Sequence, residues 1–351
     1  MGEAFQTLDS VKEYYGKILQ SNQDLKTTAC CTTASLPESL RTIVQQIHPE
    51  VSEKFYGCGA PFPPALEGKT VLDLGCGSGR DSYLLSKLVG PTGRVIGIDM
   101  TEEQLSVARR HEAFHTQAFG FEKSNVSFRK GYIEDLESAD VPSGSIDLVV
   151  SNCVLNLSPD KKRVLGEIVR VLKPGGELYF SDVFASRRVP PNLAQDLTLL
   201  GECLAGAWYL EDFRRLLFIA GIPDYRVVNR SGIQLTSPEV IQKIGMIDFA
   251  SLTIRAFKIS TLEDRCEDYG QVAYYLGSIP DMPHAFVLDD HHLFKTGMPV
   301  LVCSNTASML SQSRYRDHFR VTGDLSTHYG LFDCAPTVGA PSQIPATGAC
   351  C

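Results

Sequence analysis

A short glycine-rich stretch, Val71–Asp81 (VLDLGCGSGRD), predicts a buried strand, a tight turn and the start of a helix. Its apolar beginning suits a strand that is covered on both faces. Gly75, Gly77 and Gly79 let the backbone turn tightly and let a ligand approach the main chain. Free N–H groups at the helix start favour a carboxylate or another polar ligand group. A dinucleotide-binding fingerprint would place its third glycine one position later, where this chain has Arg80.

An acidic residue at the end of the next predicted strand agrees with this loop. The strand is Arg94–Asp99 (RVIGID), and Asp99 can accept hydrogen bonds from both hydroxyl groups of a ribose. The G-x-G-x-G pattern, which follows a strand containing Asp73, resembles motif I of the class I S-adenosylmethionine-dependent methyltransferases. An ordinary strand-turn-helix without a ligand would explain the loop alone, but not the loop together with Asp99.

Strands and helices alternate through the first half of the chain. The patterns predict helices over 10–19, 35–47, 79–89, 101–120 and 159–172, and further strands over 126–129, within 145–157 and over 177–182. This alternation predicts an α/β fold with a Rossmann-like, doubly wound parallel sheet. An acid-containing loop at 131–136 is expected to flank the adenine of a bound nucleoside.

The alternation ends after about Pro190, and we expect five parts in the chain. They are an N-terminal helical segment with a cysteine loop (1–50), the cofactor-binding domain (51–190), an elaboration over the substrate side of the sheet (191–260), a small C-terminal α+β domain (261–334) and a disordered tail that ends in cysteine (335–351).

Composition narrows the class of protein. The formal net charge of −8 disfavours nucleic acid and anionic membranes as partners. The N-terminus lacks the basic and apolar regions of a secretory signal, and no apolar run approaches the roughly 20 residues of a membrane span. We therefore expect a cytoplasmic enzyme. In a reducing compartment the eleven cysteines favour reactive or ligand roles over structural disulfides.

Four cysteines, Cys30, Cys58, Cys153 and Cys203, fall in loops or at the edges of elements around the predicted crevice. No Cys-x-x-Cys spacing indicates a zinc ribbon, and no histidine has the context of a catalytic triad. Several thiols beside a methyl donor suit a soft, thiophilic acceptor. Trivalent arsenic exchanges its hydroxyl groups for thiolates and keeps a lone pair that can attack a methyl carbon. Such a nucleophile carries no proton, so no general base is required.

With these motifs the chain resembles the arsenite methyltransferase family, of the eukaryotic type, over roughly residues 10–260. The matching segments are TACCTTA (28–34), YGCG (56–59), DLGCGSGRD (73–81), GIDMT (97–101), SNCVLNL (151–157) and GECLAGA (201–207). The resemblance implies a class I methyltransferase whose residues 191–260 help to bind arsenic and whose methyl donor is S-adenosylmethionine, without a metal cofactor.

The resemblance also assigns roles to individual residues. Cys58, Cys153 and Cys203 would bind arsenic(III), and Cys30, the fourth catalytic cysteine, would exchange a disulfide with Cys58. Cys31 lies beside it, and either of the two is a candidate for the exchanging thiol. The residues expected to contact the cofactor are Tyr56, Asp73, Gly75, Gly77, Gly79, Asp99, Met100, Gln104, Ile133, Glu134 and Asn152.

The same resemblance implies the partners of the enzyme. Arsenite and methylarsenite would arrive as thiol conjugates, and thioredoxin or glutathione would act as the reductant. We expect a monomer, with no nucleic acid and no membrane as partner.

Two other functions remain open on the residues alone. A methyltransferase for a small organic acceptor would have incidental cysteines, and a metalloid-sequestering thiol protein would bind arsenite without forming a product.

The remaining cysteines have no predicted role in the reaction. Cys76 is expected to pack in the glycine loop, and Cys266, Cys303 and Cys334 are expected to pack or to be incidental. The terminal pair 350–351 resembles both a prenylation end and a metalloid-capturing tail. The two adjacent histidines, His291 and His292, are predicted to lie in a solvated turn and not in a metal site.

Overall fold

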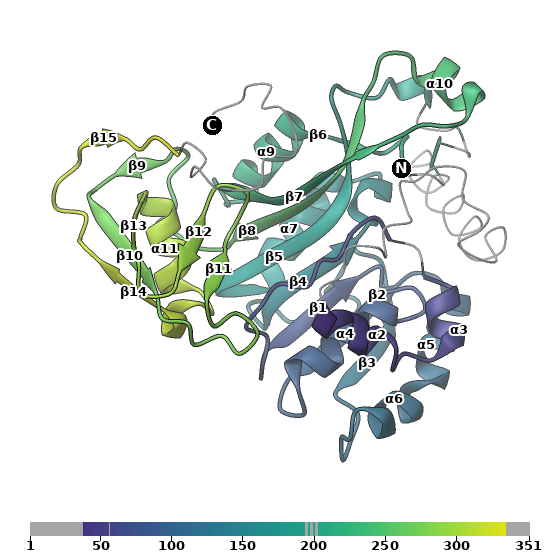
Figure 1. Cartoon of the computed structure of the whole chain (residues 1–351). Helices are drawn as coiled ribbons and strands as arrows, with labels where there is room; N and C mark the ends of the chain where they lie inside the picture. The colour runs from purple at the N-terminus through teal and green to yellow at the C-terminus, as the bar shows by residue number, and fades with distance from the viewer. Residues whose placement is uncertain (1–37, 56, 194–195, 197–198, 201–202, 335–351) are drawn as a thin grey trace.

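A twisted eight-stranded sheet forms the centre of the computed structural model, which describes residues 38–55, 57–193, 196, 199–200 and 203–334 (Figure 1). The strand order is β3-β2-β1-β4-β5-β8-β7, and β6 pairs with β5. The strands are β1 (Thr70–Leu74), β2 (Arg94–Asp99), β3 (Val126–Lys130), β4 (Ile146–Asn152), β5 (Leu172–Ala185), β6 (Trp208–Tyr209), β7 (Tyr225–Ile233) and β8 (Phe249–Phe257). The first five strands are mutually parallel, as the sequence predicts.

Helices cover both faces of this sheet, so alternate residues of a strand enter different cores. Val71 of β1 packs in the core that includes side chains of α3 (Pro49–Glu53), α4 (Arg80–Val89) and α5 (Glu102–Arg110). Leu72, the next residue, packs in the core shared with α7 (Lys161–Val171) and α9 (Leu210–Ile219). Burial on both faces explains why the strand reads as a continuous apolar run.

The sheet is wider than the sequence predicts. Strands β7 and β8 come from the segment 191–260, and they extend the central sheet beyond β5 in antiparallel order. The short helix α10 (Pro238–Ile244) lies between β7 and β8 in the chain. Another short helix, α2 (Glu38–Val44), begins the described part of the chain. The segment expected to lie over the substrate side thus also completes the scaffold.

The single helix predicted over 101–120 is wrong, because the chain bends at His111 and divides it into α5 and α6 (Glu112–Ala118). The His111 ring stacks on His48 with centroids 3.6 Å apart, and its Nε2 lies 2.7 Å from Oε2 of Glu50. These contacts with the segment around α3 fix His111 outside helical geometry. The helix predicted over 35–47 is likewise shorter in its described part, where α2 ends at Val44.

The C-terminal region has its own aromatic core, which includes Tyr275, Phe286 and Phe319. Its elements are β9 (Glu267–Asp268), β10 (Gln271–Tyr275), β11 (Ala285–Val287), β12 (Leu293–Lys295), β13 (Pro299–Val302), α11 (Ser304–Gln312), β14 (Phe319–Thr322) and β15 (Gly330–Leu331). Strands β13, β10 and β14 form a three-stranded antiparallel sheet. None of the helices described in the structure is long and apolar enough to cross a membrane.

A buried ionic cluster joins this region to the central sheet. Glu177 of β5 is fully buried and accepts hydrogen bonds from Nε of Arg255 on β8, at 2.7 Å, and from Arg314. Arg255 also donates to the backbone oxygen of Leu288 at 2.6 Å and to the hydroxyl of Tyr315 at 2.6 Å. One carboxylate therefore balances two guanidinium groups from different parts of the chain.

We expect Glu177→Gln to lower the free energy of unfolding by about 3 kcal/mol, because it leaves two buried cations without their counter-charge. The matched control is Glu239→Gln, whose side chain is 73% exposed in its pair with Lys243 and should change stability by less than about 0.5 kcal/mol. Urea denaturation of both variants measures the difference. Equal stabilities would contradict the proposed importance of this cluster.

Candidate functional site

A pocket opens where β1, β2 and β4 end, as expected for a doubly wound sheet. It contains about 1040 Å³ of empty space, part of it open to solvent. Its wall includes nine of the residues predicted to contact a cofactor: Asp73, Gly75, Gly77, Asp99, Met100, Gln104, Ile133, Glu134 and Asn152. Tyr56 lies outside the described residues. Gly79 does not line the pocket.

The glycine loop and the end of β2 hold each other in place. The N–H groups of Gly75 and Cys76 both donate to the backbone oxygen of Ile98, at 2.8 and 3.0 Å. The carboxylate of Asp99 accepts from the N–H of Gly77 at 2.9 Å and from that of Thr101 at 2.8 Å. Burial raises the pKa of Asp99, while these N–H groups oppose the increase. The acid is thus held rigidly at the base of the pocket.

The glycines of this loop have separate roles. A Cβ on Gly77, which has a φ of +51°, would meet no atom within 4 Å, so the backbone there is open to an approaching ligand. Gly79 has a φ of +88° and begins α4, and a Cβ there would meet the ring of Phe128 at 2.8 Å. Gly79 is therefore required by the packing of the loop against β3.

Acidic side chains give the pocket a negative character. Burial raises the pKa of Asp73 to about 7, and the nearby Asp81 acts in the same direction. Glu134 accepts a hydrogen bond from the hydroxyl of Ser158 through one oxygen, while its buried Oε2 has no partner among the described residues. Such a buried acceptor needs a donor from outside the protein, which a ligand or a water molecule can supply. These carboxylate groups suit S-adenosylmethionine as a ligand. Its sulfonium and ammonium groups are cationic, and its adenine carries an amino group that can donate.

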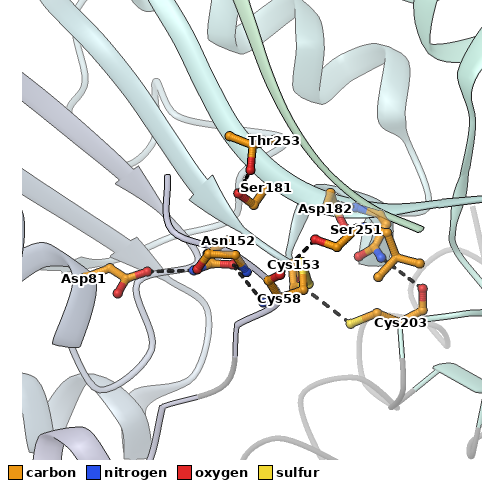
Figure 2. The surroundings of a disulfide bond; sticks show 12 residues. Cys58, Asp81, Asn152, Cys153, Ser181, Asp182, Cys203, Ser251 and Thr253 are labelled. Carbon is orange, nitrogen blue, oxygen red and sulfur yellow. Dashed lines mark hydrogen bonds between the residues drawn. A yellow bond between two sulfur atoms is a disulfide. The ribbon is translucent and has the colours of Figure 1, made fainter. Parts of the chain in front are cut away.

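Asn152, the last residue of β4, connects the pocket to the cysteines (Figure 2). Its Oδ1 accepts from the N–H groups of Cys58 and Gly59, at 3.0 and 3.2 Å. Its Nδ2 donates to the oxygen of Gly59 and to Oδ2 of Asp81, both at 2.9 Å. One buried amide therefore fixes the loop that carries Cys58 against the strand end that carries Cys153.

Cys58, Cys153 and Cys203 lie together, as Figure 2 shows. Cys58 and Cys153 form a disulfide with their Cα atoms 5.8 Å apart. The thiol of Cys203 donates to the backbone oxygen of Cys153 at 3.8 Å. All three are buried in one apolar cluster, and Cys153 also lines the pocket. The cysteine cluster thus lies next to the pocket, and Cys153 belongs to both.

This arrangement differs from the disulfide implied by the family resemblance. Cys58 is bonded to Cys153, whereas the resemblance pairs Cys58 with Cys30, which lies outside the described residues. Two of the three predicted arsenic ligands are consequently oxidised to each other. They must be reduced before they can bind a thiophilic ion.

The backbone at two cysteines is unusual for residues with a side chain. Cys153 has a φ of +57° and Cys203 a φ of +61°. Such conformations cost of the order of 1–3 kcal/mol each and cluster at functional sites, although Ala65 and Asp140 share them here. Cys203 lies in a turn before β6. The residue pattern over 193–211 predicts a continuous helix through this position, and that prediction is wrong.

Hydrogen bonds to the main chain fix each cysteine further. Ser251 donates to the oxygen of Cys58 at 2.8 Å, and the N–H of Cys153 donates to the oxygen of Ser181 at 2.8 Å. Asn156 donates to the oxygen of Cys203 at 3.1 Å. The backbones of the three cysteines are therefore held by residues of β5 and β8 and by Asn156 in the turn after β4.

Several residues of the pocket wall are not among the eleven individual residues predicted to contact the cofactor. They are Lys54, Phe55, Cys76, Ser78, Asp81, Thr101, Gly131, Tyr132, Cys153, Val154, Leu157 and Ser158. Most of them follow a predicted strand or belong to the glycine loop. Their place in the sequence could therefore have identified them, because ligands bind at the carboxyl ends of parallel strands. Cys153 appears in the prediction as an arsenic ligand.

Comparison with known proteins agrees with this geometry. Residues 65–221 match the methyltransferase domain family, and residues 268–351 match the arsenite methyltransferase C-terminal domain family. The chain is 52% identical to an arsenite methyltransferase of Aquipseudomonas alcaligenes, over 98% of this chain and 99% of that one. It is 43% identical to the human arsenite methyltransferase, over 89% and 82% of the two chains.

A solved structure extends the comparison to the fold. The structure of CrArsM, an arsenic(III) S-adenosylmethionine methyltransferase from Chlamydomonas reinhardtii, superposes with a TM-score of 0.83 at 50% identity. The match covers 85% of this chain and all of that one. On these grounds the chain belongs to the arsenite methyltransferase family and is an S-adenosylmethionine-dependent methyltransferase.

Proposed function

We propose that this enzyme transfers methyl groups to trivalent arsenic held by the thiols of Cys58, Cys153 and Cys203. The observation that carries the proposal is the position of Cys153, which lines the pocket and contacts both other cysteines. Arsenic bound there would lie beside a methyl donor in the pocket. In its reduced form the site offers three sulfur donors in apolar surroundings.

Binding exchanges oxygen for sulfur on the arsenic. Three thiols react with As(OH)₃, form three As–S bonds and release three molecules of water, so that arsenic stays trivalent and keeps its lone pair. Thiolates suit such a soft centre better than carboxylates or imidazoles. The apolar neighbours of the cysteines, among them Val183 and Leu204, exclude the released water.

S-adenosylmethionine, when bound, supplies an electrophilic methyl group. The residues of this chain would hold that group in line with the arsenic lone pair, and such positioning accounts for much of the rate in displacement reactions. Asp99 would hold the ribose, and Glu134 would accept from the adenine. Asn152 fixes the distance between the two reactants, because it anchors both cysteine-bearing segments beside the pocket.

Return to the starting state requires electrons. If methylation leaves arsenic pentavalent, two thiols must be oxidised to a disulfide while arsenic regains two electrons. An external dithiol such as thioredoxin, or glutathione, would then reduce the disulfide. The Cys58–Cys153 disulfide supports this step, because it joins two of the three proposed ligand sulfurs. Attack of the Cys30 thiol on the Cys58 sulfur would form the proposed Cys30–Cys58 disulfide and release Cys153 as a thiol.

Product analysis of Cys153→Ser tests the ligand role. We expect the parent protein, given arsenite, S-adenosylmethionine and excess thiol, to form methylated arsenic, and the variant to lose at least 100-fold in rate. Binding of S-adenosylhomocysteine, measured by calorimetry, serves as the control and should not change. Activity retained by the variant would favour a small organic acceptor, and arsenite binding without product in the parent would favour sequestration.

Asp99→Asn is expected to weaken S-adenosylhomocysteine binding 10- to 100-fold, because hydrogen bonds to a charged group contribute about 1.5–3 kcal/mol. The matched control is Glu103→Gln, an exposed acid on α5 that does not line the pocket. Calorimetric titration compares the two dissociation constants. Equal affinities in the two variants would remove Asp99 from the cofactor site.

Arsenite binding at this site should require reduction of the Cys58–Cys153 disulfide. In oxidised protein, Cys203 alone offers too few sulfur ligands, so arsenite should leave its alkylation by iodoacetamide unchanged. In reduced protein, arsenite should slow that alkylation at least tenfold. Peptide mass spectrometry reads both states, and equal protection before and after reduction would contradict the three-thiol site.

A further inference from the structure

A second group of three cysteines lies in the C-terminal region, away from the pocket. Cys266 precedes β9, Cys303 precedes α11, and Cys334 follows β15. Their three sulfur atoms all lie within 4.8 Å of one another. Figure 1 places β9, α11 and β15 together at one end of the molecule, opposite α10. The sequence predicted only packing or incidental roles, because no spacing pattern links these positions.

Within this group the surroundings of Cys303 favour thiolate, whereas the pKa values of the Cys266 and Cys334 thiols are raised. The sulfur of Cys303 caps the N-terminus of α11, where it accepts from the N–H of Thr306 at 3.4 Å. The guanidinium of Arg226 donates to the sulfurs of Cys266 and Cys303, at 3.8 and 3.6 Å. A helix N-terminus and a nearby cation both stabilise a negative sulfur.

The charges around the cysteines are partly balanced. Arg226 also pairs with Asp224 at 2.8 Å and with Asp289 at 3.6 Å. Hydrogen bonds from Cys266 and Cys334, followed by the charge of Arg226, lower the pKa of the Cys303 thiol. Arg226 thus already has two carboxylate partners, and its contacts with the cysteine sulfurs come in addition to these.

Ordinary packing does not explain the group. A buried free cysteine usually behaves as a small apolar residue. The aromatic core of the C-terminal region contains none of these three cysteines, and Cys303 is fully buried against a guanidinium. Three thiols from three separate segments, arranged around one point, instead resemble a binding site.

The number and type of donors indicate the ligand. A structural zinc site normally has four ligands, whereas the described residues provide only these three within the group. Arg226 lies against two of the sulfurs and would repel a divalent cation. Trivalent arsenic forms three bonds to sulfur and keeps a lone pair in the fourth direction, and the product is uncharged.

We propose that Cys266, Cys303 and Cys334 form a second, non-catalytic site that binds trivalent arsenic. Three thiols react with As(OH)₃, form three As–S bonds and release three molecules of water. No electrons are transferred, so neither an oxidant nor a reductant takes part in binding. Occupancy ties the segments before β9, before α11 and after β15 to one atom, and it holds arsenic outside the methylation site.

The test uses full-length reduced protein in which Cys153→Ser and Cys203→Ser disable the catalytic site. After incubation with arsenite and gel filtration, the arsenic-to-protein ratio is measured by mass spectrometry. Adding Cys303→Ser, which keeps an oxygen able to cap α11, should lower the ratio by one. Adding Cys76→Ser, a cysteine of the glycine loop, should leave it unchanged. An unchanged ratio with Cys303→Ser would overturn the proposal.

Two further measurements separate this site from its rivals. The equivalent of arsenic that is lost on Cys303→Ser should show three sulfur neighbours by X-ray absorption spectroscopy. One equivalent of zinc in the purified protein, lost on Cys303→Ser, would assign the site to zinc instead. A disulfide among these cysteines that survives reduction would overturn the proposal as well. Cys266→Ser and Cys334→Ser are also added one at a time to the protein whose catalytic site is disabled. Each should weaken arsenite binding at the second site at least tenfold, and this test holds even if Cys303→Ser unfolds the protein.

None of these outcomes affects the proposed methylation reaction. In the otherwise unaltered chain, Cys266→Ser and Cys334→Ser should retain methylated-arsenic formation, whereas Cys153→Ser should lose it.

Discussion

The hydrogen bonds of Asn152 are the constraint on which the site depends. A single amide, buried at the end of β4, accepts from two backbone N–H groups of the 57–59 loop and donates to that loop and to Asp81. These bonds form in surroundings of low polarity, where loss of one partner leaves another group unsatisfied. The loop, β4 and α4 therefore hold one relative position. The proposed arsenic-binding sulfurs and the pocket are held by the same contacts, so substrate and methyl donor would meet at a distance fixed by the fold.

Much of this could be predicted from the sequence where local chemistry decides the structure. The glycine loop and Asp99 identify the cofactor pocket, because a strand, a tight turn and an acid at the next strand end have few other uses. Asn152 and Cys153 follow β4, and the crevice of such a sheet lies at those strand ends. The alternation of strands and helices predicts the five parallel strands.

The remainder depends on contacts between distant parts of the chain. The Cys58–Cys153 pairing spans 95 residues and relies on a left-handed backbone at Cys153 that no residue pattern indicates. The break at His111 results from its contacts with His48 and Glu50, which override a good helical pattern. The cluster of Cys266, Cys303 and Cys334 arises from the tertiary fold of three loops, so spacing rules for metal sites miss it.

The ionic cluster around Glu177 makes the two halves of the molecule mutually dependent. Strand β5 carries Glu177 near its start and Ser181, whose backbone oxygen anchors Cys153, one short stretch further on. A protein shortened before the C-terminal region would lose Leu288, Arg314 and Tyr315, and with them most of the groups that cover the Arg255–Glu177 pair. Water would then reach the Arg255–Glu177 pair, on the same strand whose residue Ser181 supports Cys153, one of the proposed arsenic ligands. The C-terminal region thus completes the burial of an ion pair in the central sheet, and this burial couples the stability of the two regions.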